Sequence, residues 1–336
     1  MDMQKWLTEI INSPVKKAMP VLSFPAISLM GISVKELISS SDLQADAMKI
    51  IAERVPSLAS VSLMDLSLEA EAFGAQIHVS EEEVPTVVGS IVNSEEDAEN
   101  LVVPDVNSGR CGLYIDSIRK ACLKIQDRPV FAGVIGPFSL AGRLMDVSEA
   151  MINCYENPDM VHITLEKATE FLIKYIKEYK KAGANGVVMA EPLAGMLSPS
   201  LADEFSSQYV KKIADEVQTD DFIVIYHNCG DNILLMIDSI LSTNCAAYHF
   251  GDSIKMSDMM SHIPSDTIVM GNVSPSRQFR QGTVESIKQE TKEIMKECCS
   301  YPNFVISSGC DIPPLSSWNN IDAFFEAVDE FQKSIS

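Results

Sequence analysis

Residues 222–230, Phe222-Ile223-Val224-Ile225-Tyr226-His227-Asn228-Cys229-Gly230, combine an apolar run with two side chains that can bind a metal. The five residues of the apolar run are β-branched or aromatic and do not alternate with polar residues. Continuous apolarity of this kind is typical of a strand buried on both faces, as in a parallel sheet covered by helices. The segment therefore predicts a buried parallel strand that ends beside His227 and Cys229.

Seven further apolar runs have the same character and alternate with segments of helical spacing. The predicted strands are Pro20–Ile27, Val61–Leu66, Pro129–Ile135, Gly186–Ala190, Phe222–Tyr226, Ala246–Phe250, Thr267–Met270 and Asn303–Ser307. Among the segments between and after them, we expect helices over Asp159–Ala182, Thr283–Cys298 and Asn320–Phe331.

Eight strand candidates alternating with helices favour a closed (β/α)8 TIM barrel of the α/β class over an open doubly wound sheet. The length of 336 residues would also allow two domains, but no linker rich in Pro, Gly or Ser divides the chain. We therefore expect residues 1–336 to form a single domain with an N-terminal helical extension. The acidic segment Ser80–Asp105 is expected to be a solvated insertion between the second and third strands.

The charge balance excludes some classes of partner. Lys and Arg total 26 against 47 Asp and Glu, which gives a formal net charge of -21. Such a surface repels nucleic acid and anionic membranes, although a local basic pocket could still hold a small anion. No segment resembles a signal peptide or a membrane span, so we expect a cytoplasmic protein whose eight cysteines form no disulfide framework.

Chemistry in a barrel of this type lies at the carboxyl ends of the strands. The polar or turn residues at those ends are Asp65, the Gly136–Phe138 turn, Glu191, His227 with Cys229, His249 with Asp252, Asn272, and Cys310.

Three of these residues form a candidate metal site. His227 and Cys229 stand two apart, so in a strand their side chains point to the same side. Cys310 follows the eighth predicted strand, 81 residues after Cys229, and the mouth of a barrel would bring it near. Two thiolates and an imidazole suit zinc, and three protein ligands leave a position for substrate. The alternative is that these are ordinary buried residues.

The ligand set also indicates the kind of substrate. Two thiolates cancel the charge of the ion, so a substrate thiolate bound beside them keeps a nucleophilic sulfur.

His249 either lines the same pocket or is a structural histidine. We expect His78, His162 and His262 to be ordinary surface or interface residues.

Six segments resemble the uroporphyrinogen decarboxylase superfamily, and within it the cobamide-dependent methyltransferases that methylate coenzyme M. The resemblance covers nearly the whole chain, and its zinc motif matches at His227, Cys229 and Cys310. The segments that carry it are Asp65–Gly74 (DLSLEAEAFG), Gly136–Leu144 (GPFSLAGRL), Ala190–Pro199 (AEPLAGMLSP), His227–Gly230 (HNCG), Gly271–Pro275 (GNVSP) and Ser308–Pro313 (SGCDIP).

This resemblance implies an enzyme that moves a methyl group from the methylcobamide of a separate corrinoid protein to a small thiol. The thiol would be coenzyme M, or homocysteine where coenzyme M is lacking, and the corrinoid protein would dock at the barrel mouth. Asp65 would orient substrate or a ligand histidine, or be purely structural. Glu191 would be a fourth zinc ligand or a helix cap, and Asn272 would donate a hydrogen bond to substrate.

Three arginines are candidates for holding a sulfonate or carboxylate of the substrate, or are surface residues: Arg143, Arg277 and Arg280.

Other functions remain open at this stage. A methyltransferase with tetrahydrofolate as acceptor would not need a thiol-binding zinc. A decarboxylase is disfavoured, because the family's propionate-binding arginines are missing from Phe24–Met30. A non-catalytic barrel that docks on a corrinoid protein or stores zinc is a further alternative.

Overall fold

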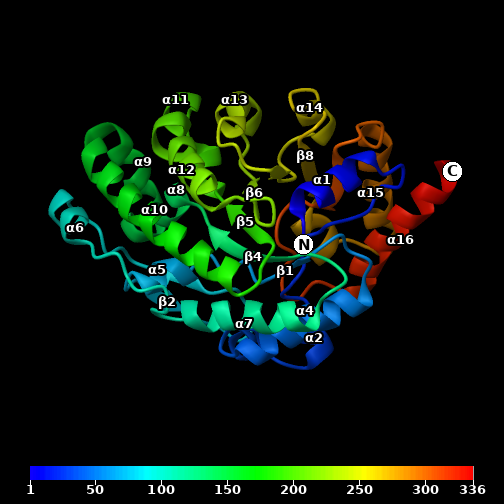
Figure 1. Ribbon diagram of the computed structural model, residues 1–336, viewed down its shortest axis with the longest axis horizontal. Coiled ribbons are helices and arrows are strands. Elements are labelled where there is room, and N and C mark those ends of the chain that lie inside the picture. Colours follow the sequence, from blue (N-terminus) through cyan, green and yellow to red (C-terminus); the bar gives the residue numbers. More distant parts are fainter. Residues whose placement is uncertain (336) are drawn as a thin grey trace.

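A curled sheet of seven parallel strands forms the centre of the computed structural model, which describes residues 1–335 (Figure 1). Neighbouring strands in the sheet are also neighbours along the chain, apart from a two-stranded hairpin inserted after the first strand. The sheet order is β1 (Ser60–Val61), β4 (Val130–Ile135), β5 (Gly186–Ala190), β6 (Ile223–Asn228), β7 (Ala247–Phe250), β8 (Ile268–Val273) and β9 (Phe304–Ser308).

Helices surround these strands (Figure 1), as the alternation of apolar runs predicts. The three helices expected from the sequence are confirmed, with bounds one or two residues from the prediction at their starts. The larger helices are α4 (Ser41–Arg54), α7 (Cys111–Lys124), α8 (Pro137–Met145), α9 (Val147–Glu156), α10 (Pro158–Lys181), α12 (Gln208–Val217), α15 (Val284–Cys298) and α16 (Trp318–Ile335).

Shorter helical segments occupy many of the turns after the strands. They are α2 (Ala26–Met30), α3 (Val34–Ile38), α5 (Leu68–Ala72), α11 (Pro199–Ala202), α13 (Ile237–Leu241), α14 (Met256–Met260), the 3-10 helices η1 (Pro192–Met196) and η3 (Ile233–Met236), and the π-helices η2 (Asp203–Ser207) and η4 (Pro275–Arg280).

The parallel α/β sheet is confirmed, but the strand predicted over Pro20–Ile27 is wrong. Residues 18–22 lie between the two edges of the sheet without forming a regular strand. The Met19 amide donates to the Ile306 carbonyl at 3.0 Å, and the Ala18 carbonyl accepts from Leu58 at 2.9 Å. Pro20 and Pro25 have no N–H to donate, so a ladder cannot continue through them. An irregular segment thus stands where an eight-stranded barrel would have its first strand.

Helix α1 (Met3–Asn12) confirms the expected N-terminal helical extension and covers one end of the sheet (Figure 1). Its apolar face consists of Met3, Trp6, Leu7 and Ile10, which pack with inward-facing side chains of the strands, including Phe131, Ile225 and Val305. The Trp6 and Phe131 rings are 5.8 Å apart. The helix therefore closes the end of the sheet opposite to the strands' carboxyl ends.

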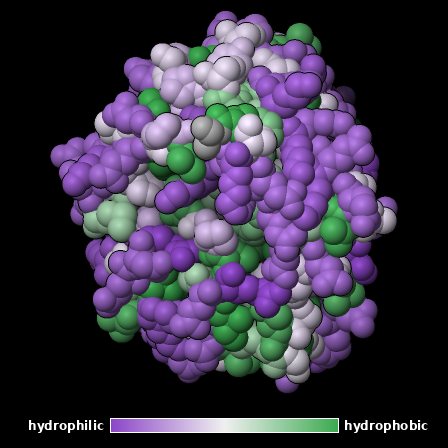
Figure 2. Space-filling view, turned by 90° about the vertical axis from the view of Figure 1, so that its right-hand side faces the viewer, coloured by the Kyte–Doolittle hydropathy of each residue, from purple (hydrophilic) through white to green (hydrophobic). Residues whose placement is uncertain are grey.

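The acidic insertion is solvated, as expected, but it is also folded. It contains β3 (Thr86–Val88), which pairs in an antiparallel hairpin with β2 (Gln76–His78) just before the insertion, and then α6 (Glu95–Asn100). The carboxylates of Glu81, Glu82 and Glu83 are exposed, whereas Val92 and Ala98 pack into the core. Figure 2 shows another face, on the side of α15 and α16, as mostly hydrophilic with small hydrophobic patches. Within residues 1–335, no helix has the length and apolarity to cross a membrane.

The packing of α1 leads to a prediction about stability. Trp6→Ala should lower the free energy of unfolding by about 3 kcal/mol, because it leaves a cavity against the strands. Lys5→Ala removes a 72% exposed side chain from the same helix and should change the free energy by less than about 0.5 kcal/mol. Urea unfolding of both variants measures these changes in free energy. Equal effects of the two substitutions would contradict the inference that α1 closes this end of the sheet.

Candidate metal centre

Strand β6 presents His227 near its end, and Cys229 follows directly after the strand. The His227 side chain is 97% buried, and Cys229 is partly exposed. The chain can turn after Cys229 because Gly230 lies against Gly195, where a Cβ atom would stand 2.4 Å from the Gly195 Cα. A side chain at Gly251 would meet the Cys229 Cβ at the same distance. Both glycines therefore allow Cys229 to face the centre.

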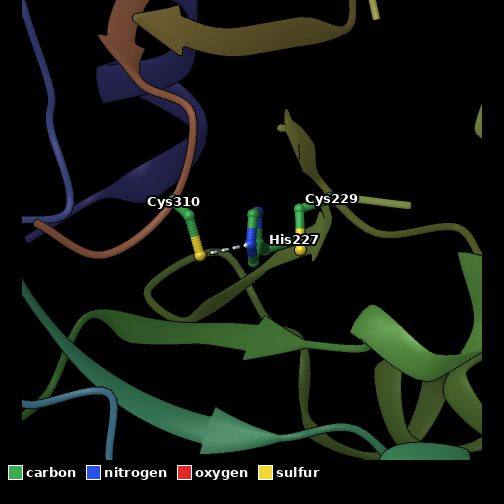
Figure 3. A group of neighbouring side chains, drawn as sticks. All are labelled: His227, Cys229 and Cys310. Carbon is green, nitrogen blue, oxygen red and sulfur yellow. Dashed lines mark hydrogen bonds between the residues drawn. The ribbon is translucent and has the colours of Figure 1, made fainter. Parts of the chain in front are cut away.

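Cys310 reaches this pair from the segment after β9, as the sequence predicts. The Cys310 Sγ lies 3.4 Å from the His227 Nε2. One ligand atom from each of His227, Cys229 and Cys310 lies within 4.8 Å of the others. Figure 3 shows the Cys310 sulfur directed at the His227 ring, with Cys229 on the other side of the ring.

The two cysteines of the cluster differ in acidity. A hydrogen bond with Cys310 and the neighbouring His227 hold the pKa of Cys229 well below its usual range. The same hydrogen bond, together with burial, raises the pKa of Cys310. All eight cysteines are free, as expected. The donor set of two sulfurs and an imidazole nitrogen fits zinc.

His249 lies beside His227 on the neighbouring strand, because the register of β6 and β7 pairs the two residues. Its Nδ1 is 2.8 Å from the His227 Nδ1, and its Nε2 is 2.8 Å from the Ser307 Oγ. Burial and the neighbouring His227 lower the pKa of His249, so its ring is neutral. The prediction left pocket and structural roles open for His249, and the structure places it directly behind His227.

Asp65 lies in a separate buried ion-pair network after β1. Its Oδ2 accepts hydrogen bonds from Arg110 and from the Tyr114 hydroxyl at 2.9 Å, and its Oδ1 accepts from Ser67. Arg110 also pairs with Glu71 at 2.7 Å. These contacts fit the structural role that was left open for Asp65, and its role in orienting substrate or a ligand histidine stays a prediction.

Glu191 is completely buried at the end of β5, and its carboxylate faces the start of α8. Oε1 accepts from the Phe138 amide at 2.7 Å and from Ser206 at 2.9 Å, and Oε2 accepts from the Ser139 amide at 3.1 Å. Burial raises its pKa to about 7, against the effect of these donors. The helix-capping role is thus the one visible in its contacts, and Glu191 is not among the three clustered ligands.

Asn272 supports the loop after β7. Its Nδ2 donates to the carbonyls of Gly251 at 2.9 Å and Ile254 at 2.8 Å. Because Gly251 touches Cys229, Asn272 contributes indirectly to the position of that ligand. Its predicted hydrogen bond to substrate stays a prediction.

The three candidate arginines differ in their surroundings. Arg277 on η4 is exposed, and its Nη2 lies 3.8 Å from the Asp252 carboxylate, at the rim of the metal cluster. The same Asp252 carboxylate is close enough to Cys229 to influence its pKa. Arg143 is half-buried on α8, and burial lowers its pKa. Neither Arg143 nor Arg280 has an ion pair within residues 1–335.

The sequence interpretation missed Glu69 and Arg110. Glu69 is fully buried, and burial raises its pKa to about 8; one oxygen accepts from the Ile135 amide at 3.1 Å. Its other oxygen has no partner. Arg110 follows the acidic insertion, so no strand-end position identifies it in the sequence. Glu69 stands four residues after Asp65, the spacing of one helical turn. This spacing is the one feature of the sequence that indicates that the two carboxylates lie near each other.

Comparison with known proteins assigns the chain to a family. The profile of uroporphyrinogen decarboxylase (URO-D) matches residues 12–331, nearly the whole chain. This chain belongs to the URO-D family. The resemblance inferred from the six sequence segments is therefore confirmed.

Members of the URO-D family similar to this chain carry two different names. The methylcobamide:CoM methyltransferase MtbA of Methanosarcina acetivorans is 24% identical over 80% of this chain and 78% of its own. A uroporphyrinogen decarboxylase of Coxiella burnetii is 27% identical over 83% of this chain and 78% of its own. A solved methyltransferase structure from Methanosarcina mazei, 24% identical, superposes with a TM-score of 0.86 over 98% of both chains. Because relatives with both names are similar to this chain over most of its length, similarity alone does not decide its activity. The residues of the site must distinguish methyl transfer from decarboxylation.

The lowered pKa of Cys229 predicts selective reactivity in the metal-free protein. Because the pKa of Cys229 is depressed, its thiolate persists as the pH falls, so Cys229 should still react with iodoacetamide at pH 6. Burial raises the pKa of both Cys122 and Cys299 to about 11, so these partly exposed thiols should not react. Peptide mass spectrometry after a short exposure measures the three sites together. Equal labelling at pH 6 would contradict the lowered pKa.

Proposed function

We propose that this protein binds zinc through His227, Cys229 and Cys310 and transfers a methyl group from a methylated corrinoid protein to a small thiol. The observation that carries the proposal is the clustering of two sulfurs and one imidazole nitrogen within 4.8 Å. When bound there, zinc would lower the pKa of a substrate thiol while leaving its sulfur nucleophilic. Three ligands leave the position that such a thiol requires.

The chain's own residues orient this chemistry. The sulfurs of Cys229 and Cys310 lie on opposite sides of the His227 ring (Figure 3), and both residues come directly after the carboxyl ends of strands. A substrate sulfur held there would take the methyl group from the methylated corrinoid protein, and the bonding electron pair would remain with cobalt. The thiol proton goes to solvent, and the protein contributes by positioning the sulfur.

Exposed apolar side chains support docking of a corrinoid protein on the same side. Leu235 in η3 is 72% exposed and Met196 in η1 is 57% exposed. Leu29 in α2 and Leu315 after β9 are also exposed. Each residue stands in a segment that directly follows a strand or the irregular segment, so all four lie on the side of the metal cluster. Exposed apolar residues around a site are typical of a protein interface.

Decarboxylation of a tetrapyrrole is less compatible with the site. The segment Phe24–Met30 contains no cation, and in the structure it forms the turn into α2. Carboxylate side chains of such a substrate need arginines, and the net charge of -21 would repel them. Transfer of the methyl group to tetrahydrofolate would leave the two clustered thiols without a role.

We also propose that residues 1–336 act as one methyltransferase domain.

The acceptor is proposed to be a small anionic thiol such as coenzyme M, with homocysteine as the alternative. Arg277 is the best placed of the three candidate arginines, because its partner Asp252 adjoins Cys229. A sulfonate or carboxylate on a short chain from the bound sulfur could reach this guanidinium. The exposure of Arg277 leaves it free to turn from Asp252 to the substrate.

The metal content of the purified protein tests the ligand assignment. Protein prepared under reducing conditions with zinc should contain about one zinc per chain. His227→Ala, Cys229→Ser and Cys310→Ser should lose the metal and the transfer from methylcobalamin to thiol, with the fold retained. Cys298→Ala and Cys299→Ala should keep both properties.

Two results would contradict the function. Absence of zinc from the wild-type protein would refute the ligand set. Tetrahydrofolate would then be tested as the methyl acceptor. Conversion of uroporphyrinogen, without methyl transfer to any thiol, would favour the decarboxylase alternative.

Substitution of Arg277 tests the acceptor class. Arg277→Gln should raise the KM for coenzyme M about fivefold, the effect of losing an exposed charge contact. The kcat should stay the same, and so should turnover of the neutral thiol 2-mercaptoethanol. Arg280→Gln, on the same helix, serves as the matched control. An equal loss with both thiols would show that Arg277 does not recognise the anionic group.

A further inference from the structure

A continuous hydrogen-bond chain runs from His227 into the core. It passes from the His227 Nδ1 to the His249 Nδ1 at 2.8 Å, from the His249 Nε2 to the Ser307 Oγ at 2.8 Å, and from Ser307 to the Met19 carbonyl at 2.7 Å. His249 and Ser307 are both completely buried or nearly so. The chain therefore lies out of contact with solvent, behind the metal cluster.

The far end of the chain determines where each proton lies. The Met19 carbonyl can only accept, so the Ser307 hydroxyl must donate to it. Ser307 then accepts from the His249 Nε2–H, which leaves the His249 Nδ1 with a lone pair. That lone pair accepts from the His227 Nδ1–H, whose second acceptor is the His249 carbonyl at 3.3 Å. In the neutral ring, Nε2 is therefore the nitrogen with the free lone pair, and it faces Cys310.

We infer that His249 and Ser307 are positioning residues that lock His227 in the Nδ1–H tautomer, with Nε2 available to the metal. This inference rests on the proposed zinc site and identifies what prepares it. A ligand histidine usually donates its other N–H to a carboxylate, carbonyl or water. In this protein the acceptor is a second histidine, whose own tautomer is set by a serine and a backbone carbonyl.

The hydrogen-bond chain from His227 to Met19, called the relay below, also gives a role to the irregular segment that replaces the first strand. Met19 belongs to that segment, and its carbonyl points at Ser307 rather than into a regular ladder. The adjacent Ser308 hydroxyl accepts from the Val21 amide at 3.0 Å. The side chains of Ser307 and Ser308 thus bind the same segment, but of the two hydroxyls the one that contacts His249 is that of Ser307. This difference supplies a matched pair of variants.

Zinc affinity, measured by competition with a chromophoric chelator, tests the relay without any methyl donor. His249→Leu removes the acceptor of His227 and should weaken zinc binding about 10- to 100-fold. His249→Asn places a carbonyl oxygen at the position of Nδ1 and should restore part of that loss. Ser307→Ala should weaken binding less than His249→Leu. Ser308→Ala, which affects only the closure of the sheet, should change it by less than about threefold.

Nitrogen-15 NMR of the wild-type protein provides a test that needs no variant. With histidine labelled and zinc bound, His227 should show a protonated Nδ1 and a metal-bound Nε2, and His249 a protonated Nε2. A metal-bound His227 Nδ1 would overturn the inference. So would a folded His249→Leu protein with wild-type zinc affinity.

The outcomes separate this inference from the proposed function. Wild-type protein that binds no zinc would refute both. Tight zinc binding that weakens in His249→Leu, without methyl transfer to any thiol, would support the relay and refute the proposed function. Normal methyl transfer together with unchanged zinc affinity in His249→Leu would refute the relay alone.

Discussion

The curvature of the parallel sheet is the constraint on which the metal centre depends. His227 lies on β6 and Cys310 follows β9, three places away in the sheet order. In a flat sheet three strand spacings amount to about 14 Å. The observed distance of 3.4 Å between Nε2 and Sγ requires the sheet to curl and the strand ends to converge. Right-handed strand twist and helices on the outer face produce that curl.

Closure of the curl relies on hydrogen bonds outside a regular ladder. Ala18 and Met19 connect β9 to the chain before β1, and Ser307 and Ser308 hold the same segment through their hydroxyls. Side chains of β9 thus bind the backbone groups on either side of Pro20. The Ser307 side chain also contacts His249, so a feature of sheet closure reaches the surroundings of His227.

Two buried carboxylates near the strand ends are held by the protein itself. Asp65 is held by Arg110 and Tyr114, and Glu191 caps α8. An uncompensated buried charge is costly, and these contacts offset that cost. Other carboxylates lie beside the sulfurs of the cluster, since Asp311 directly follows Cys310 and the Asp252 carboxylate adjoins Cys229.

Sequence by itself determined the class of fold of this protein and predicted the three residues of its candidate metal cluster, His227, Cys229 and Cys310. Apolar runs without alternation identified seven of the observed strands, because burial on both faces leaves no polar positions. The pair His227 and Cys229 could be assigned to one side because strand periodicity is local. The distant Cys310 was found from its place after a strand, supported by the family resemblance.

Tertiary structure alone decided what depends on packing between distant segments. Pro20 looked compatible with an apolar run, yet its missing N–H matters only once neighbouring strands exist. Contacts of Asp65 and Glu191 come from α7 and α8, which sequence spacing does not relate to them. The role of His249 depends on the register of β6 against β7 and on Ser307 from β9. Register and curvature arise from long-range hydrogen bonds, so no local pattern could reveal them.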